Sequence, residues 1–423
     1  MLDLKAIRAD PDPFHRALAR RGASEDLDRA LRLDEERRAL TVRVEALRAE
    51  QNRGSRGMSS TDGAEHQALV RRMRSVSEEL EKIEPELSRV EEQLAEVMAR
   101  LPNVPGDSVP DGASEDDNVE IRRWGEPPEF DFDPRDHVAL GEALGVIDIE
   151  RGVRTSGARF YYLTGAAVRL QFAMVQYALE FTEGLGFMPV VPPVLVREEA
   201  MFGTGFLPTD ETQLYVTRED NLYLVGTSEV PLANLHAGEI LDPGALPRRY
   251  LGYSTCFRRE AGTYGKDTRG ILRVHQFDKL EMFSFVLPEQ SRDEHERLLA
   301  WEEEWVRSLG IPYRVMNVCT GELGASAAKK YDIEAWLPGQ GRYREITSTS
   351  NTTDYQARRM GCRVRLPDGN RPVHTLNATL CAVGRTLIAL LENGQRRDGS
   401  VVLPEVLHRF LPERHRVLQP GES

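Results

Sequence analysis

Apolar residues follow a heptad rhythm from about residue 69 to residue 101. They recur alternately four and three positions apart, at Leu69, Met73, Val76, Leu80, Ile83, Leu87, Val90, Leu94, Val97 and Leu101. An earlier segment repeats this spacing at Leu33, Leu40, Val44 and Leu47. The pattern predicts two amphipathic helices with a coiled-coil seam. The turn-rich stretch between them, residues 52–63, is expected to break the helix, so that the pair folds back as an antiparallel hairpin.

Pro85 falls inside the second predicted helix, where proline ordinarily kinks the chain. Counting from the seam places Pro85 on the outer face, so we expect a mild bend and no break. Because such an arm buries only one narrow stripe, we expect it to project from the body of the protein. Taken alone, the heptads favour a dimerisation coiled coil.

The chain changes character after this arm. Residues 101–105 and the acidic run 111–117 are typical of a linker. We therefore predict an N-terminal domain at 1–103, a linker at 104–135 and a second domain at 136–423, in which strands and helices mix. In the second domain, residues 166–185 have helical periodicity, and the Pro-rich stretch 186–195 predicts an extended edge strand.

Residues 256–277 have the pattern of a β-hairpin: apolar, then charged and Gly-rich, then apolar and β-prone again. Arg258, Arg259 and Arg273 stand where an ordinary hairpin carries Val or Thr, and Phe277 follows them. Guanidinium groups clamp oxyanions through paired hydrogen bonds, and an aromatic face stacks on a base. The hairpin therefore fits a triphosphate with an attached base, although a charged hairpin surface explains these residues equally well.

Composition limits the class of protein. A chain of 423 residues is too long for one ordinary core, and its 40% hydrophobic and 29% charged residues are typical of a globular protein. No apolar run approaches the roughly 20 residues that a membrane span needs, and the first residues do not resemble a signal peptide. We expect a cytoplasmic protein without a membrane partner. The four cysteines are far apart and predict neither a zinc site nor a disulfide framework.

The net charge of −13 argues against a nucleic-acid partner when it is taken as a sum. The charge is unevenly distributed, because arginines gather near the apex of the predicted hairpin at Arg48, Arg53, Arg56, Arg71, Arg72 and Arg74. A locally basic tip on an acidic body can still bind RNA. On charge alone, a solvated helix face explains the arginines equally well.

Other nucleotide folds lack support. The chain contains no Gly-x-x-x-x-Gly-Lys-Ser/Thr loop and no Gly-x-Gly-x-x-Gly after a strand, and the glycines of residues 262–270 are too loosely spaced to count. Segments of the His-Ile-Gly-His or Lys-Met-Ser-Lys type are also absent from the sequence.

Several segments, taken together and in this order, resemble the seryl-tRNA synthetases, a family of class II aminoacyl-tRNA synthetases. They are Gly226–Pro231, Phe257–Glu260, His275–Glu281, Arg344–Ser348, Ser350-Asn351, Gln356–Arg359, His374–Asn377 and Gly384–Thr386. The resemblance runs from Met1 to Val406 and implies an α+β fold. That fold has an N-terminal antiparallel two-helix coiled-coil arm and a class II catalytic domain, an antiparallel β-sheet flanked by helices. The arginine-bearing hairpin is then motif 2, and residues 186–195, which include Pro193, are similar to motif 1, the dimer element of the family.

The resemblance implies a role for each site residue. Arg258, Arg385 and Glu345 would be catalytic, with Arg258 on the α-phosphate and Arg385 on the γ-phosphate. The ATP-binding residues would be Arg258, Arg259, Glu260, Val274, Phe277, Glu345, Ile346, Thr347, Ser348 and Arg385. The serine-binding residues would be Thr227, Ser228, Glu229, Arg258, Glu281, Asn377 and Thr379. Glu345 and Ser348 would hold Mg²⁺ with ATP, since this ion prefers oxygen ligands.

The resemblance also implies the reaction and the partners. Serine and ATP would form seryl-adenylate, and the seryl group would move to the 3′ end of serine tRNA; tRNA(Sec) is a further candidate substrate. The arm would hold the tRNA through its shape and backbone, across the two subunits of a homodimer. Ala378 departs from the family, which more often has Gly there, and this puts fine substrate preference in question.

Three alternatives stay open at this point. They are a tRNA-binding paralogue without activity, a ligase that charges a carrier protein, and a duplicated synthetase that serves antibiotic resistance or biosynthesis. Intact Arg258, Glu281, Glu345 and Arg385 argue against the first, and the long basic-tipped hairpin argues against the second. The chemistry of the third would be identical to that of the housekeeping enzyme.

Overall fold

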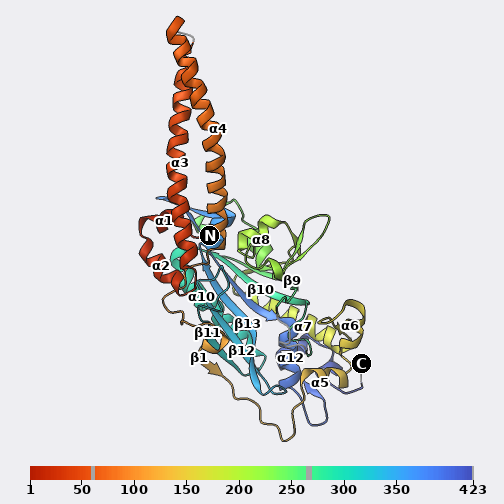
Figure 1. Ribbon diagram of the computed structural model, residues 1–423. Helices are drawn as coiled ribbons and strands as arrows, with labels where there is room; N and C mark the ends of the chain where they lie inside the picture. Colours follow the sequence, from red (N-terminus) through yellow and green to blue (C-terminus); the bar gives the residue numbers. More distant parts are fainter. Residues whose placement is uncertain (59–61, 263–268, 422–423) are drawn as a thin grey trace. The chain divides into compact units, whose positions relative to one another are not determined.

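The two heptad segments form two long helices that run side by side, α3 (Ser24–Gly57) and α4 (Gly63–Arg100) (Figure 1). Their shared seam buries Val44, Leu47, Met73, Val76, Leu80 and Ile83. The predicted coiled-coil arm is therefore confirmed. Two short helices precede it, α1 (Leu4–Ala9) and α2 (Pro11–Ala19). The computed structural model describes residues 1–58, 62–262 and 269–421, so part of the predicted turn and part of the hairpin loop, including Gly265 and Thr268, lie outside the described residues.

The break between the helices is shorter than the predicted residues 52–63, because α3 continues to Gly57 and α4 begins at Gly63. Gly54 is buried against the partner helix: a Cβ atom at this position would lie 2.0 Å from Met73 Sδ. This glycine therefore leaves room for a seam side chain and does not make a turn. Pro85 is exposed and α4 continues through it, as its place on the outer face predicts.

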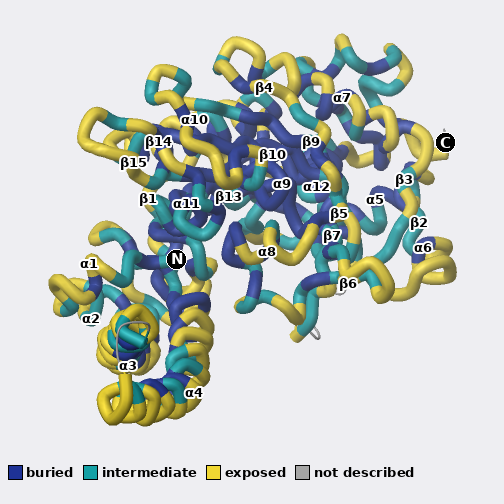
Figure 2. Tube along the Cα trace, turned by 90° about the horizontal axis from the view of Figure 1, so that it is seen from above, coloured by how far each residue is buried: buried dark blue, intermediate teal, exposed yellow. Residues whose placement is uncertain are grey.

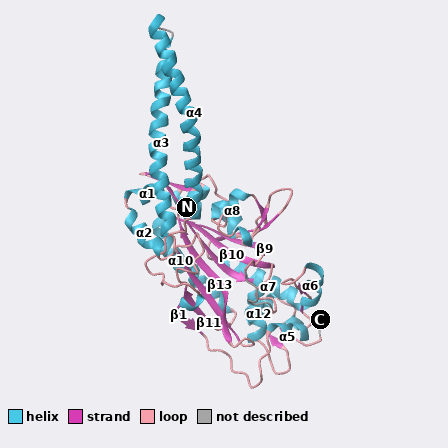
Figure 3. Cartoon of the chain, in the orientation of Figure 1, coloured by secondary structure: helices cyan, strands magenta, loops and turns pink. Residues whose placement is uncertain are grey.

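An eight-stranded sheet forms the centre of the rest of the chain (Figure 3). In spatial order its strands are β1 (Val119–Trp124), β11 (Tyr313–Asn317), β12 (Lys329–Leu337), β13 (Arg342–Thr353), β16 (His374–Ala382), β10 (Gln276–Val286), β9 (Arg248–Phe257) and β4 (Phe187–Val190). Every neighbouring pair is antiparallel except β4 and β9. The predicted hairpin is the β9–β10 pair, and the Pro-rich stretch supplies the edge strand β4.

One strand lies where we predicted only linker. β1 falls within residues 104–135 and pairs with β11 at the other edge of the sheet. The acidic run 111–117 directly before it hides this strand in the sequence, because Val119 and Ile121 alternate with charged residues for only a few positions.

Among the described residues, eight helices accompany the sheet. They are α5 (His137–Ala143), α6 (Ile149–Ser156), α7 (Gly165–Glu183), α8 (Glu198–Thr204), α9 (Glu229–Asn234), α10 (Ser291–Ser308), α11 (Tyr355–Met360) and α12 (Val383–Asn393). Of these, α7, α9, α10, α11 and α12 pack directly on the sheet. In the largest core, Leu170 of α7, Trp305 of α10 and Leu387 of α12 pack with Leu280 and Met282 of β10. A second cluster holds Phe283 and Phe285 of β10 with α9 and α11. Buried residues accordingly follow β9, β10, β13 and α9 (Figure 2).

The remaining elements are short. The small strands are β2 (Ile147–Asp148), β3 (Tyr162–Leu163), β5 (Leu195–Val196), β6 (Tyr215–Val216), β7 (Tyr223–Leu224), β8 (Ile240–Leu241), β14 (Arg363–Leu366), β15 (Gly369–Pro372), β17 (Val401–Val402) and β18 (Val417–Leu418). Short 3-10 helices lie at Glu115–Asp117, Glu211–Gln213, Pro243–Ala245, Pro288–Gln290, Glu405–Phe410 and Glu413–His415.

The chain divides into two compact units, residues 2–102 and residues 103–423 together with residue 1. Within the described ranges, the helices are all too short or too polar to traverse a lipid bilayer.

Candidate active site

A cavity of about 390 Å³ opens on the sheet face formed by β10, β13 and β16. Predicted site residues from six separate segments line it: Thr227, Glu229, Arg258, Glu260, Val274, Phe277, Glu281, Glu345, Ile346, Thr347, Ser348, Asn377, Thr379 and Arg385. The fold therefore brings together residues that are up to about 160 positions apart in the sequence, as a long-range antiparallel sheet does.

Two irregularities of the sheet aim side chains at this cavity. Glu281 lies opposite Thr379 because the β10–β16 register shifts at this point, and Thr379 Oγ1 donates to Glu281 Oε2 at 3.4 Å. On β13, Glu334 pairs with Glu345 but Ile333 pairs with Thr347, so Ile346 has no partner on β12. Residues three apart on a regular strand point to opposite faces, whereas here both Glu345 and Ser348 line the cavity.

Arg258 follows directly on β9 and is held by its surroundings. Its Nε donates to the Gly226 carbonyl at 3.1 Å, and its guanidinium lies 5.3 Å from the centre of the Phe277 ring. The backbone N–H of Arg258 donates to the His275 carbonyl at 2.9 Å. A cation fixed in this way faces the cavity without further loss of side-chain freedom, as recognition of a phosphate requires.

A second arginine stands in the first turn of α12. Arg385 Nη1 donates to the Glu345 carbonyl at 3.1 Å and lies 3.3 Å from Glu345 Oε1. Burial alone would raise the pKa of Glu345, but Arg385, Lys330 and Arg258 outweigh it and hold this pKa well below its usual range. Glu345 is therefore an anion beside two guanidiniums, and it can ligate a cation.

The other end of the cavity carries buried acids. Glu229 Oε1 accepts from Gln356 Nε2 at 2.7 Å. Burial, and secondly the nearby Glu281, raise the pKa of Glu229 to about 7. Lys279 forms an ion pair with Glu281 and donates through Nζ to Thr227 Oγ1 at 2.7 Å. With two carboxyl groups and one lysine, this end suits a small ligand that carries both an ammonium group and a hydroxyl group.

Two predicted residues do not line the cavity. Ser228 is fully buried, and a Cβ atom at Gly252 would lie 3.0 Å from its Oγ, so it packs α9 against β9. Arg259 is exposed, and its backbone N–H donates to the Gln213 carbonyl at 2.9 Å.

Sequence reasoning missed several polar residues of the site, among them Lys279, Gln356 and Lys330. Lys279 alternates with Phe277 and Glu281 on β10, and this period of two was the available signal. Gln356, which orients Glu229, lies within a segment that carried the family resemblance. Lys330 forms an ion pair with Asp332 at 2.9 Å. Burial alone would lower the pKa of Lys330, but the charges of Asp332 and Glu345 outweigh it and raise this pKa. Nothing in the sequence placed Lys330 near Glu345.

Comparisons with known proteins agree with this geometry. The model of the tRNA synthetase class II core domain (G, H, P, S and T) matches residues 213–394, and that of the seryl-tRNA synthetase N-terminal domain matches residues 1–105. A serine–tRNA ligase of Acidothermus cellulolyticus is 51% identical over 412 residues, which cover 97% of this chain and 98% of the relative. A crystal structure of seryl-tRNA synthetase from Pyrococcus horikoshii complexed with ATP is 40% identical, with a TM-score of 0.93 and coverage of 100% of both chains. Another, from Naegleria fowleri in complex with AMP, is 33% identical, with a TM-score of 0.85 and coverage of 98% and 96%.

The fold and the cavity are thus those of a class II aminoacyl-tRNA synthetase. Within that class, the relatives cover the whole length of the chain, arm included. The chain belongs to the seryl-tRNA synthetase family.

Proposed function

We propose that the cavity binds ATP and L-serine side by side and joins them as seryl-adenylate. A carboxylate oxygen of serine attacks the α-phosphorus, the bond from this phosphorus to the bridging oxygen breaks, and pyrophosphate leaves. A hydroxyl group at the 3′ end of serine tRNA then attacks the seryl carbonyl carbon, the bond from this carbon to the phosphate oxygen breaks, and AMP leaves. The observation that carries the proposal is the meeting of two arginines, one aromatic ring and two buried acids in a single cavity.

At the nucleotide end, Arg258 binds the α-phosphate and the reacting carboxylate, where charge develops during the displacement. Arg385 holds the γ-phosphate. Phe277 stacks on adenine, and Glu260 and Val274 complete the pocket. Positioning and electrostatics are sufficient for such chemistry, so no covalent nucleophile of the protein is required.

Glu345 and Ser348 are the residues that would hold Mg²⁺. Both line the cavity and offer oxygen ligands, and the lowered pKa keeps Glu345 ionised. When bound with ATP, Mg²⁺ neutralises part of the phosphate charge. Phosphate oxygens and water would supply the remaining ligands of the ion.

At the serine end, Glu229 accepts from the ammonium group and Glu281 from the hydroxyl group, with Thr379 beside it and Lys279 balancing the charge. A buried acceptor left without its donor is costly, so the site rejects alanine strongly. The lining residues Thr227 and Asn377 complete this end. Ala378 follows Asn377 on β16 and is fully buried within the largest core, and the preference for serine analogues is a matter for measurement.

The arm would bind serine tRNA. The tip arginines form ion pairs across or along the helices, Arg48 with Glu84, Arg72 with Glu50 and Arg74 with Glu78, and all three are more than half exposed. Surface ion pairs contribute little to stability, so phosphate groups can replace the glutamates. In this proposal the tRNA crosses from one subunit of a homodimer to the other, in the cytoplasm.

A catalytically silent paralogue is disfavoured, since Arg258, Arg385, Glu281 and Glu345 all face the cavity. No feature of the described residues favours a duplicated copy with a resistance or biosynthetic role, or extends charging to tRNA(Sec).

The proposal is tested by ATP–pyrophosphate exchange with and without L-serine. We expect exchange only with serine, and Arg258→Ala should lower kcat/KM by at least about a hundredfold, the scale of losing one charge partner of the transition state. Arg259→Ala is the matched control, because this neighbouring arginine is exposed and does not line the cavity. Its substitution should lower kcat/KM far less. Exchange that is equally fast without serine would contradict the proposal.

A further inference from the structure

The chain that returns from the hairpin loop forms one wall of the cavity. Ile271, Leu272, Arg273 and Val274 all line it before β10 begins. This wall belongs to no helix or strand, so its position depends on contacts from elsewhere. We call residues 269–274 the return segment.

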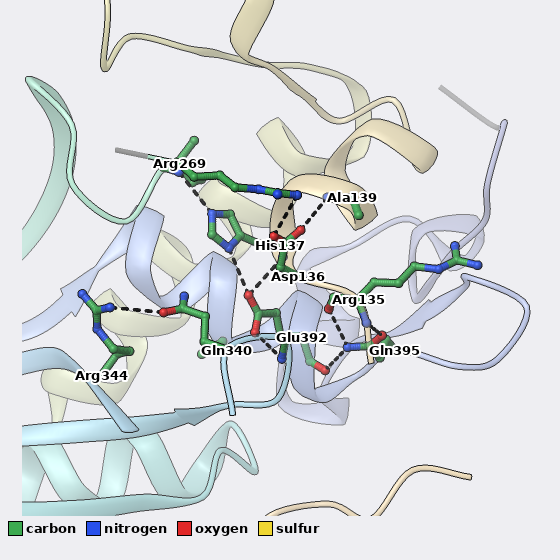
Figure 4. Close-up of polar contacts among 12 residues, drawn as sticks. Arg135, Asp136, His137, Ala139, Arg269, Gln340, Arg344, Glu392 and Gln395 are labelled. Atoms are coloured by element: carbon green, nitrogen blue, oxygen red, sulfur yellow. Dashed lines mark hydrogen bonds and ion pairs between the residues drawn. The ribbon is translucent and has the colours of Figure 1, made fainter. Parts of the chain in front are cut away.

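A buried histidine holds the return segment from outside the cavity. The Ile271 N–H donates to His137 Nε2 at 3.2 Å. His137 begins α5, is only 3% exposed, and is not among the residues that line the cavity. In Figure 4 its ring lies between the return segment, where Arg269 is labelled, and Glu392 of α12.

Glu392 determines the orientation and the tautomer of this ring. Its Oε1 lies 3.0 Å from His137 Nδ1 and accepts from the His137 backbone N–H at 3.0 Å, while its Oε2 accepts from the Gly339 N–H at 2.9 Å. Because the Ile271 N–H can only donate, Nε2 must accept and carries no proton. The proton is therefore on Nδ1, where it is donated to the fully buried carboxylate.

Two neighbouring contacts make the attachment close. Gly270 has a φ of +81°, and a Cβ atom there would lie 2.0 Å from His137 Nε2, so only glycine lets the chain approach the ring. Arg269 lies 3.1 Å from Asp136, the residue before His137. Three consecutive residues of the return segment thus lie against two consecutive residues at the start of α5.

We propose that His137, oriented by Glu392, is a positioning residue for the nucleotide end of the active site. It fixes the backbone of the return segment, and with it the wall that faces ATP. The serine end depends on β10, β16 and α9 and makes no contact with His137 among the described interactions. The inference rests on the proposed function, because the wall matters only if the cavity binds ATP.

Two isosteric variants separate this role from mere packing. Asn at position 137 keeps a donor near the place of Nδ1 but offers no acceptor to Ile271, whereas Gln can place an acceptor near Nε2. In ATP–pyrophosphate exchange, we expect His137→Asn to raise the KM for ATP roughly tenfold, the effect of one lost hydrogen bond and a displaced wall. The KM for serine should change little, and His137→Gln should recover much of the loss.

His236→Asn is the matched control. His236 is also buried, and it bonds Glu239 at 2.8 Å and Tyr250 at 2.7 Å, but it does not line or support the cavity. It should leave the KM for ATP unchanged. If His137→Asn yields little folded protein, Gly270→Ala decides, because it displaces the return segment and leaves the His137–Glu392 pair in place; it should also raise the KM for ATP.

An unchanged KM for ATP in both His137→Asn and Gly270→Ala would overturn the inference. Equal increases in the KM for ATP and for serine would do the same, since they indicate a general loss of structure. Failure of the proposed function has a different signature, the absence of serine-dependent exchange in the unaltered protein.

Discussion

Glu229 shows how the environment of one residue sets its protonation. It is buried, it accepts a hydrogen bond from Gln356, and Glu281 lies close enough to oppose its ionisation. The pKa of about 7 means that the carboxyl group exchanges its proton near physiological pH. An arriving ammonium group needs the ionised form.

We therefore expect kcat/KM for serine to depend on pH. The pKa of Glu229 is raised, so below about pH 7 the group is neutral in the free enzyme, and binding of an ammonium group must first expel its proton. From about pH 6 to about pH 8, kcat/KM for serine should rise by about tenfold in all, most of it below about pH 7, and then level off. Exchange measured at saturating ATP checks this.

Glu229→Gln provides the comparison for the same measurement. It is neutral at every pH, so its profile should be flat and low across that range. A wild-type profile without any step between these pH values would remove Glu229 from contact with the ammonium group.

The segments that line the cavity were predictable from the sequence, and the roles of their residues remain a proposal. Arg258, Phe277 and Glu281, whose roles the family resemblance implies, all line the same cavity. Ser228 and Arg259 lie in the same segments but do not line the cavity, since a short motif does not say which of its side chains reach the site. Lys279 lies between Phe277 and Glu281 on the same face of β10, a placement that follows from the two-residue period of a strand.

Elements were predictable where the pattern was long. Ten apolar positions in heptad register predict α4 through its internal proline, and the hairpin pattern predicts β9 and β10. Short or irregular features were not: Gly54 looked like part of a turn but serves helix packing, and β1 was hidden behind acidic residues. The register shifts that bring Glu281 opposite Thr379 and Ser348 beside Glu345 have no local sequence signal, because they depend on pairing between distant strands.

The edge formed by α7 and β4 leads to a prediction about assembly. These neighbouring elements expose large apolar side chains, whose contact with water is unfavourable. Phe172 is 51% exposed, Met188 is 61% exposed, and Val191, just after β4, is 81% exposed. The family resemblance of residues 186–195 to motif 1 agrees with a dimer interface here. Phe172→Glu combined with Met188→Glu should convert a dimer to a monomer in sedimentation velocity. Each subunit of a dimer would otherwise bury two unpaired carboxylates at the interface, which is costly.

Val42→Glu is the control for this experiment. Val42 is 67% exposed on α3, away from α7 and β4 in the sequence, and its substitution should leave the oligomeric state unchanged. If the unaltered protein sediments as a monomer at micromolar concentration, or if the double variant remains a dimer, this edge is not the interface.

At the scale of the whole molecule, we assign tRNA binding to one compact unit and serine activation to the other. The arm uses its apolar seam between α3 and α4, and among the described residues the cavity is lined by those after position 203. Domain bounds of 1–103, 104–135 and 136–423 remain a proposal, and the place of β1 in the large sheet indicates that a deletion of the arm should stop well before Val119.

The central claim, that the cavity activates serine and the arm delivers the tRNA, is tested most directly in a chain without the arm. Residues 32–97 would be replaced by a short Gly/Ser linker, and both half-reactions measured on the same preparation. Serine-dependent ATP–pyrophosphate exchange should survive within a few-fold, whereas transfer of serine to tRNA should collapse and the salt dependence of tRNA affinity should decrease with the lost arginine–phosphate contacts. If the shortened chain charges serine tRNA with the kcat/KM of the full protein, the arm does not recognise the tRNA, and the heptads are better explained as a dimerisation element.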